Sequence, residues 1–156
     1  MKLHSIRVSN FQSFGAEPTE LTLENITYLI GPNGSGKTAA LQALCRLFAF
    51  DPSLRRIQRS DFHVPHDEQE APEERQLWIE DPDGIPRVRY RLSATMGLDG
   101  DIDETFVYVL EAGPDGSPLN PQTVPRSERN HIQVHYLPAR RDPTDHIAYG
   151  TNALLG

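Results

Sequence analysis

The sequence has little cysteine, no long apolar run and no excess of basic charge. Its one cysteine, Cys45, excludes an internal disulfide framework and fits a reducing compartment. No stretch approaches the roughly 20 apolar residues of a membrane-spanning helix, and the N-terminus MKLHSIRVSN lacks the apolar core of a signal peptide. We therefore expect a cytoplasmic protein that has no membrane partner.

The 156 residues carry a net charge of −7, which is unevenly distributed. Residues 1–60 hold seven Lys/Arg against four Asp/Glu, whereas residues 61–125 hold four against fifteen. Such a chain does not attract nucleic acid through its bulk charge. The most basic run, RRIQR at 55–59, fits a solvated surface better than a contact with a phosphate backbone.

Alternating and clustered apolar residues predict an α/β domain with a central sheet around residues 26–30 and an antiparallel β lobe attached to it. The predicted strands are residues 3–8, 21–23, 26–30, 76–80, 87–94, 104–111 and 131–137. The run 26–30 is β-branched, aromatic and almost wholly apolar, which predicts a strand buried on both faces at the centre of a sheet. The turn signals DPDGIP and GLDGD predict an antiparallel meander after residue 75, and residues 61–75 are predicted to be a mobile loop.

A helix is predicted from Lys37 to Ala49. Leu41, Leu44, Cys45 and Phe48 recur at the spacing of one helical face, so Cys45 is expected in the core. The dipeptide at 51–52, Asp-Pro, ends the helix.

The strongest motif is the phosphate-binding loop (P-loop) at residues 31–38, which fits G-x-x-x-x-G-K-[ST] between a predicted strand and a predicted helix. Its glycines let successive backbone N–H groups point at phosphates, and the helix start adds its positive dipole end. Lys37 should bridge the β- and γ-phosphates of ATP, and the Thr38 hydroxyl should bind Mg²⁺. The predicted nucleotide-binding residues of the loop are Gly31, Pro32, Asn33, Gly34, Ser35, Gly36, Lys37 and Thr38.

Hydrolysis needs an additional acid at the end of a second buried strand, and no segment supplies it convincingly. The segment LWIED at 77–81 runs straight into a turn, and DIDE at 101–104 lies in a polar turn. No LSGG-like signature is present. We therefore assign no catalytic residue to this chain.

Other clusters of reactive side chains have simple structural interpretations. Asp61, His63, His66 and Asp67 have spacing that suits a divalent metal, but an exposed loop explains them as well. On a strand, the histidines at 131 and 135 would lie about 13 Å apart, too far to share one metal. A surface salt bridge accounts for the arginines at 140 and 141 better than a phosphate or a partner domain.

The N-terminal 48 residues resemble the start of an ABC-type ATPase head of the RecF, SMC and OLD (overcoming lysogenization defect) groups. The similarity lies in IRVSNFQSFG and YLIGPNGSGKTAALQALCRLF. Two later stretches, RSDFH at 59–63 and YLPARRD at 136–142, are most similar to OLD-family ATP-dependent endonucleases.

The resemblance implies that residues 1–156 form a single N-terminal domain, part of an ABC-type head with an antiparallel β lobe attached to a central sheet. It implies ATP and Mg²⁺ as cofactors and a second copy of the head as partner, with DNA bound and cut by regions outside this chain. Ser13 and Phe14 match a segment that approaches the nucleotide, and Gln12 stands where many members have Arg or Lys. Gln58 and Gln133 are candidates for the glutamine that senses Mg²⁺ and nucleotide.

The sequence therefore predicts an ATP-binding part of an OLD-like ATP-dependent endonuclease in phage defence or DNA repair. Two alternatives stay open. One is a non-enzymatic ATP-binding module that regulates or scaffolds, and the other is a RecF- or SMC-type DNA-repair ATPase without nuclease activity.

Overall fold

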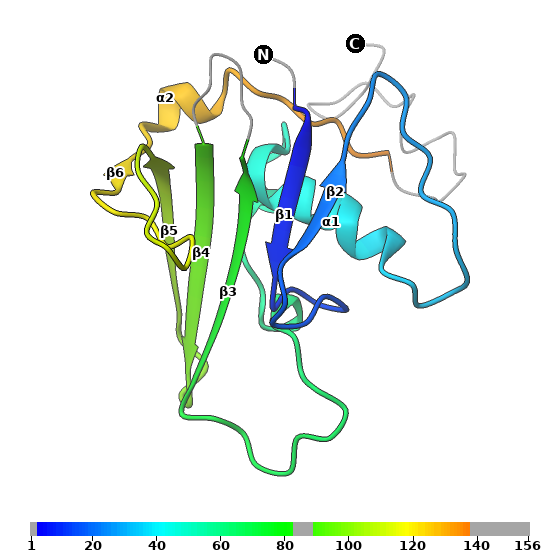
Figure 1. Ribbon diagram of the computed structural model, residues 1–156, viewed down its shortest axis with the longest axis vertical. Helices are drawn as coiled ribbons and strands as arrows, with labels where there is room; N and C mark the ends of the chain where they lie inside the picture. The colour runs from blue at the N-terminus through cyan, green and yellow to red at the C-terminus, as the bar shows by residue number, and fades with distance from the viewer. Residues whose placement is uncertain (1–2, 83–88, 138–156) are drawn as a thin grey trace.

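The computed structural model describes residues 3–82 and 89–137, which form a twisted sheet with one long helix against it (Figure 1). The strands are β1 (Ser5–Ser9), β2 (Thr19–Thr22), β3 (Glu74–Asp81), β4 (Arg89–Gly97), β5 (Ile102–Val109) and β6 (Gln122–Thr123). The helices are α1 (Lys37–Phe48), α2 (Arg126–Arg129) and the 3-10 turns η1 (Pro52–Arg55) and η2 (Arg59–Asp61). Within the described ranges, no helix is long and apolar enough to cross a membrane.

The strand order is β2-β1-β3-β4-β5-β6, and every neighbouring pair is antiparallel. The predicted meander is confirmed as β3, β4 and β5, although the third strand lies two residues earlier than predicted. The β4–β5 turn places Gly100 at a φ of 79°, a left-handed conformation that glycine adopts without a steric penalty. The beginning of the predicted strand 87–94 lies outside the described residues.

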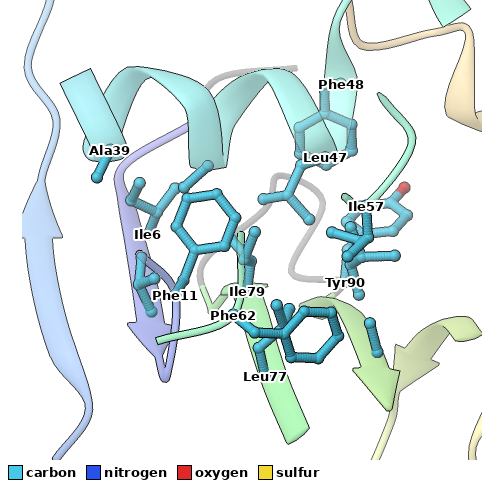
Figure 2. Packing of buried hydrophobic residues seen from close by; sticks show 14 of the residues in the cluster. Ile6, Phe11, Ala39, Leu47, Phe48, Ile57, Phe62, Leu77, Ile79 and Tyr90 are labelled. Carbon is cyan, nitrogen blue, oxygen red and sulfur yellow. The ribbon is translucent and has the colours of Figure 1, made fainter. Parts of the chain in front are cut away.

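Alternation along the strands separates a core face from a polar face. Tyr90 and Leu92 of β4 are buried against α1, whereas Arg89 and Arg91 point to the opposite face, as predicted. The core lies between α1 and the sheet (Figure 2) and includes Leu47, Phe48, Leu77 and Ile79. The Phe48 ring meets the Tyr90 ring edge-on with centroids 5.6 Å apart, a favourable geometry for aromatic pairs.

The predicted helix is confirmed as α1, but its buried face is rotated from the predicted one. Ala39, Ala43 and Leu47 face the sheet at a spacing of four residues, and Cys45 is buried as predicted. Leu41 is 43% exposed instead. Small alanines let the helix approach the sheet closely. The helix therefore buries the face that carries Ala39 and Ala43 and not the face that carries Leu41.

The prediction of a buried strand at residues 26–30 is wrong. This segment has no regular secondary structure, and Tyr28 and Ile30 are 79% and 92% exposed. β2 is an edge strand of the sheet, and the residues that follow it continue to the P-loop without pairing to its free edge. An apolar, β-branched composition indicates strand propensity but does not supply neighbouring strands.

The prediction of a strand at residues 131–137 is also wrong, because most of this segment has no strand structure. Only Val134 forms a bridge, parallel to Ala49 at the end of α1, while His131 N–H bonds to the Glu128 carbonyl in a turn. The arginines at 140 and 141 lie outside the described residues.

The predicted mobile loop 61–75 begins with two buried residues. Asp61 is fully buried and Phe62 is 4% exposed, whereas most of residues 63–73 are exposed coil. The coil ends where β3 begins, at Glu74, one residue earlier than the predicted end of the loop. The mobility of the coil stays a prediction.

The C-terminus of α1 is held by residues that lie far along the chain. Arg129 of α2 donates from Nε to the Leu47 carbonyl at 2.9 Å and from Nη2 to the Arg46 carbonyl at 2.5 Å. Val134 N–H donates to the Phe48 carbonyl at 2.8 Å. These carbonyls have no partner within the helix, so the segment that contains α2 completes the end of α1.

Burial lowers the pKa of Arg129 to about 10, so its guanidinium stays charged at neutral pH. We expect Arg129→Met to reduce the free energy of unfolding by about 2–3 kcal/mol, because two carbonyls lose a charged donor. Urea denaturation would measure the loss. Arg126→Met is the control, because Arg126 is an exposed arginine of the same helix and should change stability by less than about 0.5 kcal/mol. Equal effects of the two substitutions would contradict the capping role.

Cys45 should report on unfolding. It is 3% exposed, and burial raises the pKa of its thiol above the ordinary value, so little reactive thiolate exists in the folded state. We expect a thiol reagent such as DTNB to modify the native protein at least about 100-fold more slowly than the urea-unfolded protein. Reaction at the same rate in both states would show that the α1 core face is accessible.

Candidate functional site

The P-loop connects the exposed segment before residue 31 to the first turn of α1. Gly34 and Gly36 have φ values of 83° and 86°, in the left-handed region that favours glycine. Gly36 is the residue before the helix, and Lys37 is its first residue. The two glycines let the chain curl tightly into the positive end of the helix dipole.

Lys37 lies inside this curl. Its ammonium donates to the carbonyls of Gly31 and Pro32 at 2.7 and 2.6 Å, and it lies 3.4 Å from the Ser35 hydroxyl. A cation that is already enclosed by the loop is well placed to meet an anion bound there. The Thr38 hydroxyl follows on the same turn and is exposed.

A second loop, residues 10–15 (the N-terminal loop), covers one side of the P-loop. Its Ser13 hydroxyl lies 3.0 Å from the position of a side-chain carbon built on Gly36, and the Phe14 ring lies 3.3 Å from it. The two loops surround a cavity of about 290 Å³, which is lined by Gln12, Ser13, Asn33, Gly34, Gly36, Lys37, Thr38 and Ala39. The structure thus brings Ser13 and Phe14 to the P-loop.

The glutamine candidates at 58 and 133 do not line this cavity. Gln58 precedes η2, where its backbone N–H donates to Asp61 Oδ2 at 2.9 Å. Gln58 is linked to the cavity only indirectly, because it bonds to Asp61, which accepts from the cavity-lining Gln12. Its role in sensing Mg²⁺ stays a prediction. Gln133 donates weakly to the Asn130 carbonyl at 3.4 Å and lies in the segment that contacts the C-terminus of α1.

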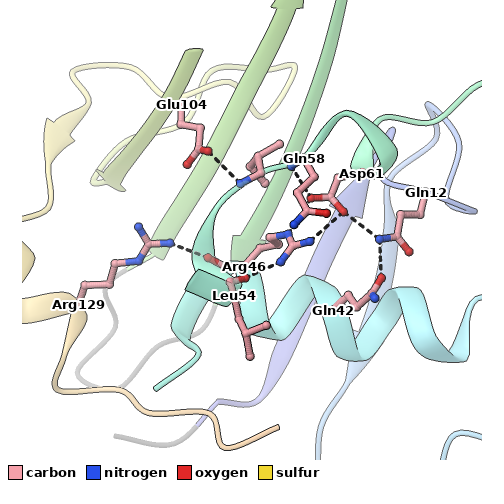
Figure 3. A network of polar contacts seen from close by, with 9 residues as sticks. Gln12, Gln42, Arg46, Leu54, Gln58, Asp61, Glu104 and Arg129 are labelled. Atoms are coloured by element: carbon pink, nitrogen blue, oxygen red, sulfur yellow. Dashed lines mark hydrogen bonds and ion pairs between the residues drawn. The ribbon is translucent and has the colours of Figure 1, made fainter. Parts of the chain in front are cut away.

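A buried ion pair beside the site was not predicted from the sequence (Figure 3). Arg46 of α1 donates from Nε to Asp61 Oδ2 at 2.7 Å, and both side chains are almost fully buried. The signal was an arginine inside the apolar run LCRLF, whose charge needs a partner once that helix face is buried. Asp61 also accepts from the Gln12 side chain at 2.9 Å.

The side chains of Asp61, His63, His66 and Asp67, whose spacing would suit a metal as well as an exposed loop, do not gather into a metal cluster. No group of three or more His, Cys, Asp or Glu within 3–82 and 89–137 is arranged to hold a metal ion. Asp61 is paired with Arg46, and His63 Nδ1 lies 2.6 Å from the Gln12 carbonyl. His131 is exposed, and the His135 ring stacks on Phe50 at 5.0 Å.

The acidic residues at the end of β3 lie away from the P-loop. Trp78 pairs with Ser9 and Glu80 with Arg7, so β3 runs away from the N-terminal loop that follows Ser9. Glu80 is fully buried and accepts from Arg89 at 2.6 Å and from Arg91 at 2.9 Å. This geometry supports a structural role for Glu80, as the sequence indicates.

Residues 1–81 match the AAA ATPase domain family (AAA_15). The chain belongs to this family. Among curated proteins, this chain is 30% identical over 167 residues to the OLD nuclease of Thermus scotoductus, an alignment that covers 99% of this chain and 30% of that protein. The chain therefore spans about a third of the length of that relative.

Solved structures of SMC ATPase heads share the fold of this chain. One of these structures comes from a study of the ATP-driven dimerization of SMC ATPases. It matches this chain with a TM-score of 0.52 at 15% identity, and the alignment covers 85% of this chain and 77% of that one. The Smc head domain from Pyrococcus furiosus, with an extended coiled coil, gives 0.50 at 15% identity over 83% of this chain and 32% of that one. The prediction of a partial ABC-type P-loop head in the OLD and SMC groups is confirmed.

Two glycine substitutions test the packing of the N-terminal loop on the P-loop. Gly34→Ala meets no atom within 4 Å and carries only the cost of a left-handed residue, about 1 kcal/mol. Gly36→Ala carries the same cost and also presses on Ser13 and Phe14, which should add about 1–2 kcal/mol. Urea denaturation measures both, and equal losses would contradict the contact between the two loops.

Proposed function

We propose that this AAA ATPase domain binds Mg-ATP through residues 31–38, with Ser13 of the N-terminal loop closing one side of the site. Backbone N–H groups of the P-loop and the Lys37 ammonium would hold the phosphates, and the Thr38 hydroxyl would bind Mg²⁺. The Mg²⁺ ion would neutralise phosphate charge when bound. Ala39 is buried in the hydrophobic core and keeps the first turn of α1 against the sheet.

The position of Lys37 carries this proposal. Its ammonium lies within hydrogen-bonding distance of two P-loop carbonyls, at the first residue of α1. A structural glycine turn would not need a cation at the most electropositive point of a helix, where it costs free energy. A polyphosphate supplies the negative charge that makes this arrangement favourable.

We propose further that the chain is the ATP-binding part of an OLD-like ATP-dependent endonuclease in phage defence or DNA repair. The match to the OLD nuclease runs along 99% of the chain, which supports a common organisation. The nuclease centre and the DNA contacts would lie in the other parts of such a protein. ATP would control the association of two heads. SMC ATPases of the same fold undergo ATP-driven dimerization.

A second candidate is an ATP-binding module that does not hydrolyse the nucleotide. The described residues that line the cavity include no carboxylate, and Glu80 is satisfied by arginines on another part of the sheet. Hydrolysis needs a group that orients water and an acid that completes the Mg²⁺ site. The chain of 156 residues is therefore expected to bind ATP with little turnover.

Lys37→Ala should weaken Mg-ATP binding by about 100-fold or more, because a charge-assisted contact with phosphate is lost. Isothermal titration calorimetry with a slowly hydrolysed ATP analogue and Mg²⁺ would measure the change. The melting temperature should move little, because the Lys37 side chain is not part of the core.

Binding that survives Lys37→Ala would exclude the P-loop as the ATP site. Steady ATP turnover by the unchanged chain, abolished by Lys37→Ala, would instead show that the chain contains a complete catalytic set. That result would contradict the non-hydrolysing candidate and the assignment of no catalytic residue.

A further inference from the structure

We infer that Asp61 is a positioning residue for the nucleotide site, acting through Gln12. The buried Asp61 carboxylate holds the N-terminal loop against α1, and this contact sets the wall of the cavity beside the P-loop. The inference rests on the proposed ATP site and assigns a role to two residues outside the P-loop motif.

Asp61 is surrounded by hydrogen-bond donors (Figure 3). Its Oδ1 accepts from Gln12 Nε2 at 2.9 Å and Arg46 Nη2 at 3.2 Å, and its Oδ2 accepts from Arg46 Nε at 2.7 Å and Gln58 N–H at 2.9 Å. The side chain is fully buried. Only an ionised carboxylate, which accepts and never donates, satisfies every one of these groups at once.

Gln12 is held in an unfavourable backbone conformation by several contacts. Its φ is 50°, in the left-handed region that a residue other than glycine adopts at a cost. Its N–H donates to the Asp61 carbonyl at 2.7 Å, and its carbonyl lies 2.6 Å from His63 Nδ1. Its side-chain amide also donates to Gln42 of α1 at 2.5 Å. Strain that is maintained by this many partners is typical of functional sites.

The consequence reaches the P-loop within one residue. Gln12 lines the cavity together with Lys37 and Thr38, and the next residue, Ser13, packs on Gly36. The Gln12 side-chain amide donates both to Asp61 and to Gln42 of α1, and without these two contacts the N-terminal loop would lose its side-chain anchor to the middle of α1. Ser13 would then no longer be fixed relative to the phosphate-binding backbone.

Gln12→Met tests this role while keeping the length of the side chain and adding no charge. We expect Mg-ATP binding to weaken about tenfold, measured by calorimetry at a temperature where circular dichroism shows every variant folded. Gln76→Met is the matched control, because Gln76 is exposed on the polar face of β3 and should bind like the unchanged protein. A purely structural role would lower the melting temperature of Gln12→Met and leave its affinity unchanged, and this result would overturn the inference.

Asp61→Asn provides a second variant. The asparagine amide has one N–H₂ group in place of an accepting oxygen, and this group would face one of the N–H donors of Arg46, Gln12 or Gln58 and lose that hydrogen bond. If both residues act through one contact, the double variant should bind no more weakly than the weaker single variant. Full multiplication of the two losses would overturn the coupling. If Asp61→Asn does not fold, Gln12→Met with its control decides alone.

The outcomes separate this inference from the proposed function. Loss of binding in Lys37→Ala but unchanged binding in Gln12→Met would leave the ATP site in place and overturn the role of Asp61. No ATP binding by the unchanged protein would overturn both.

Discussion

The buried ion pair between Arg46 and Asp61 is the interaction on which the site depends. It joins the P-loop helix, the turn before the exposed coil and, through Gln12, the N-terminal loop. Removing two charges from water is costly, and the cost is recovered only when every lone pair and proton finds a partner. Here Arg46 also donates from Nη1 to the Leu54 carbonyl at 2.5 Å, so the pair fixes one geometry for three segments and tolerates few others.

The helix that carries the P-loop is thus restrained on its side and at its end by different means. Beside the cavity, polar contacts with Asp61 and Gln42 hold the N-terminal loop to it. At the other end, Arg129 satisfies the last carbonyls and lies over the Phe106 ring at 4.4 Å. Between these points, alanines and aromatic rings bury the helix on the sheet. A rigid helix keeps its N-terminal N–H groups directed at one place, which phosphate binding requires.

Local patterns were sufficient to predict the P-loop, α1 and the meander, because each is specified by residues close together in the chain. The prediction of a strand at 26–30 failed because its apolar residues describe a preference that only a neighbouring strand can satisfy, and the segment does not pair with the free edge of β2. The role of Asp61 could not be predicted, because its partner Arg46 lies 15 residues away and the sequence does not show which acid the arginine in the apolar run LCRLF would meet. The left-handed Gln12 likewise results from contacts with residues 61–63 and has no sequence signature.

The capping of α1 by Arg129 and Val134 also bears on the order in which the chain folds. The family match ends at residue 81, yet the last carbonyls of the P-loop helix are completed by residues 82 or more positions further along. During synthesis, this helix therefore emerges from the ribosome long before its C-terminal partners do. We expect its end to stay frayed until about residue 134 is available, because its last carbonyls have no partner within the helix, and contacts over such separations slow folding. The smallest cooperatively folding unit accordingly extends well beyond residue 81, where the family match ends.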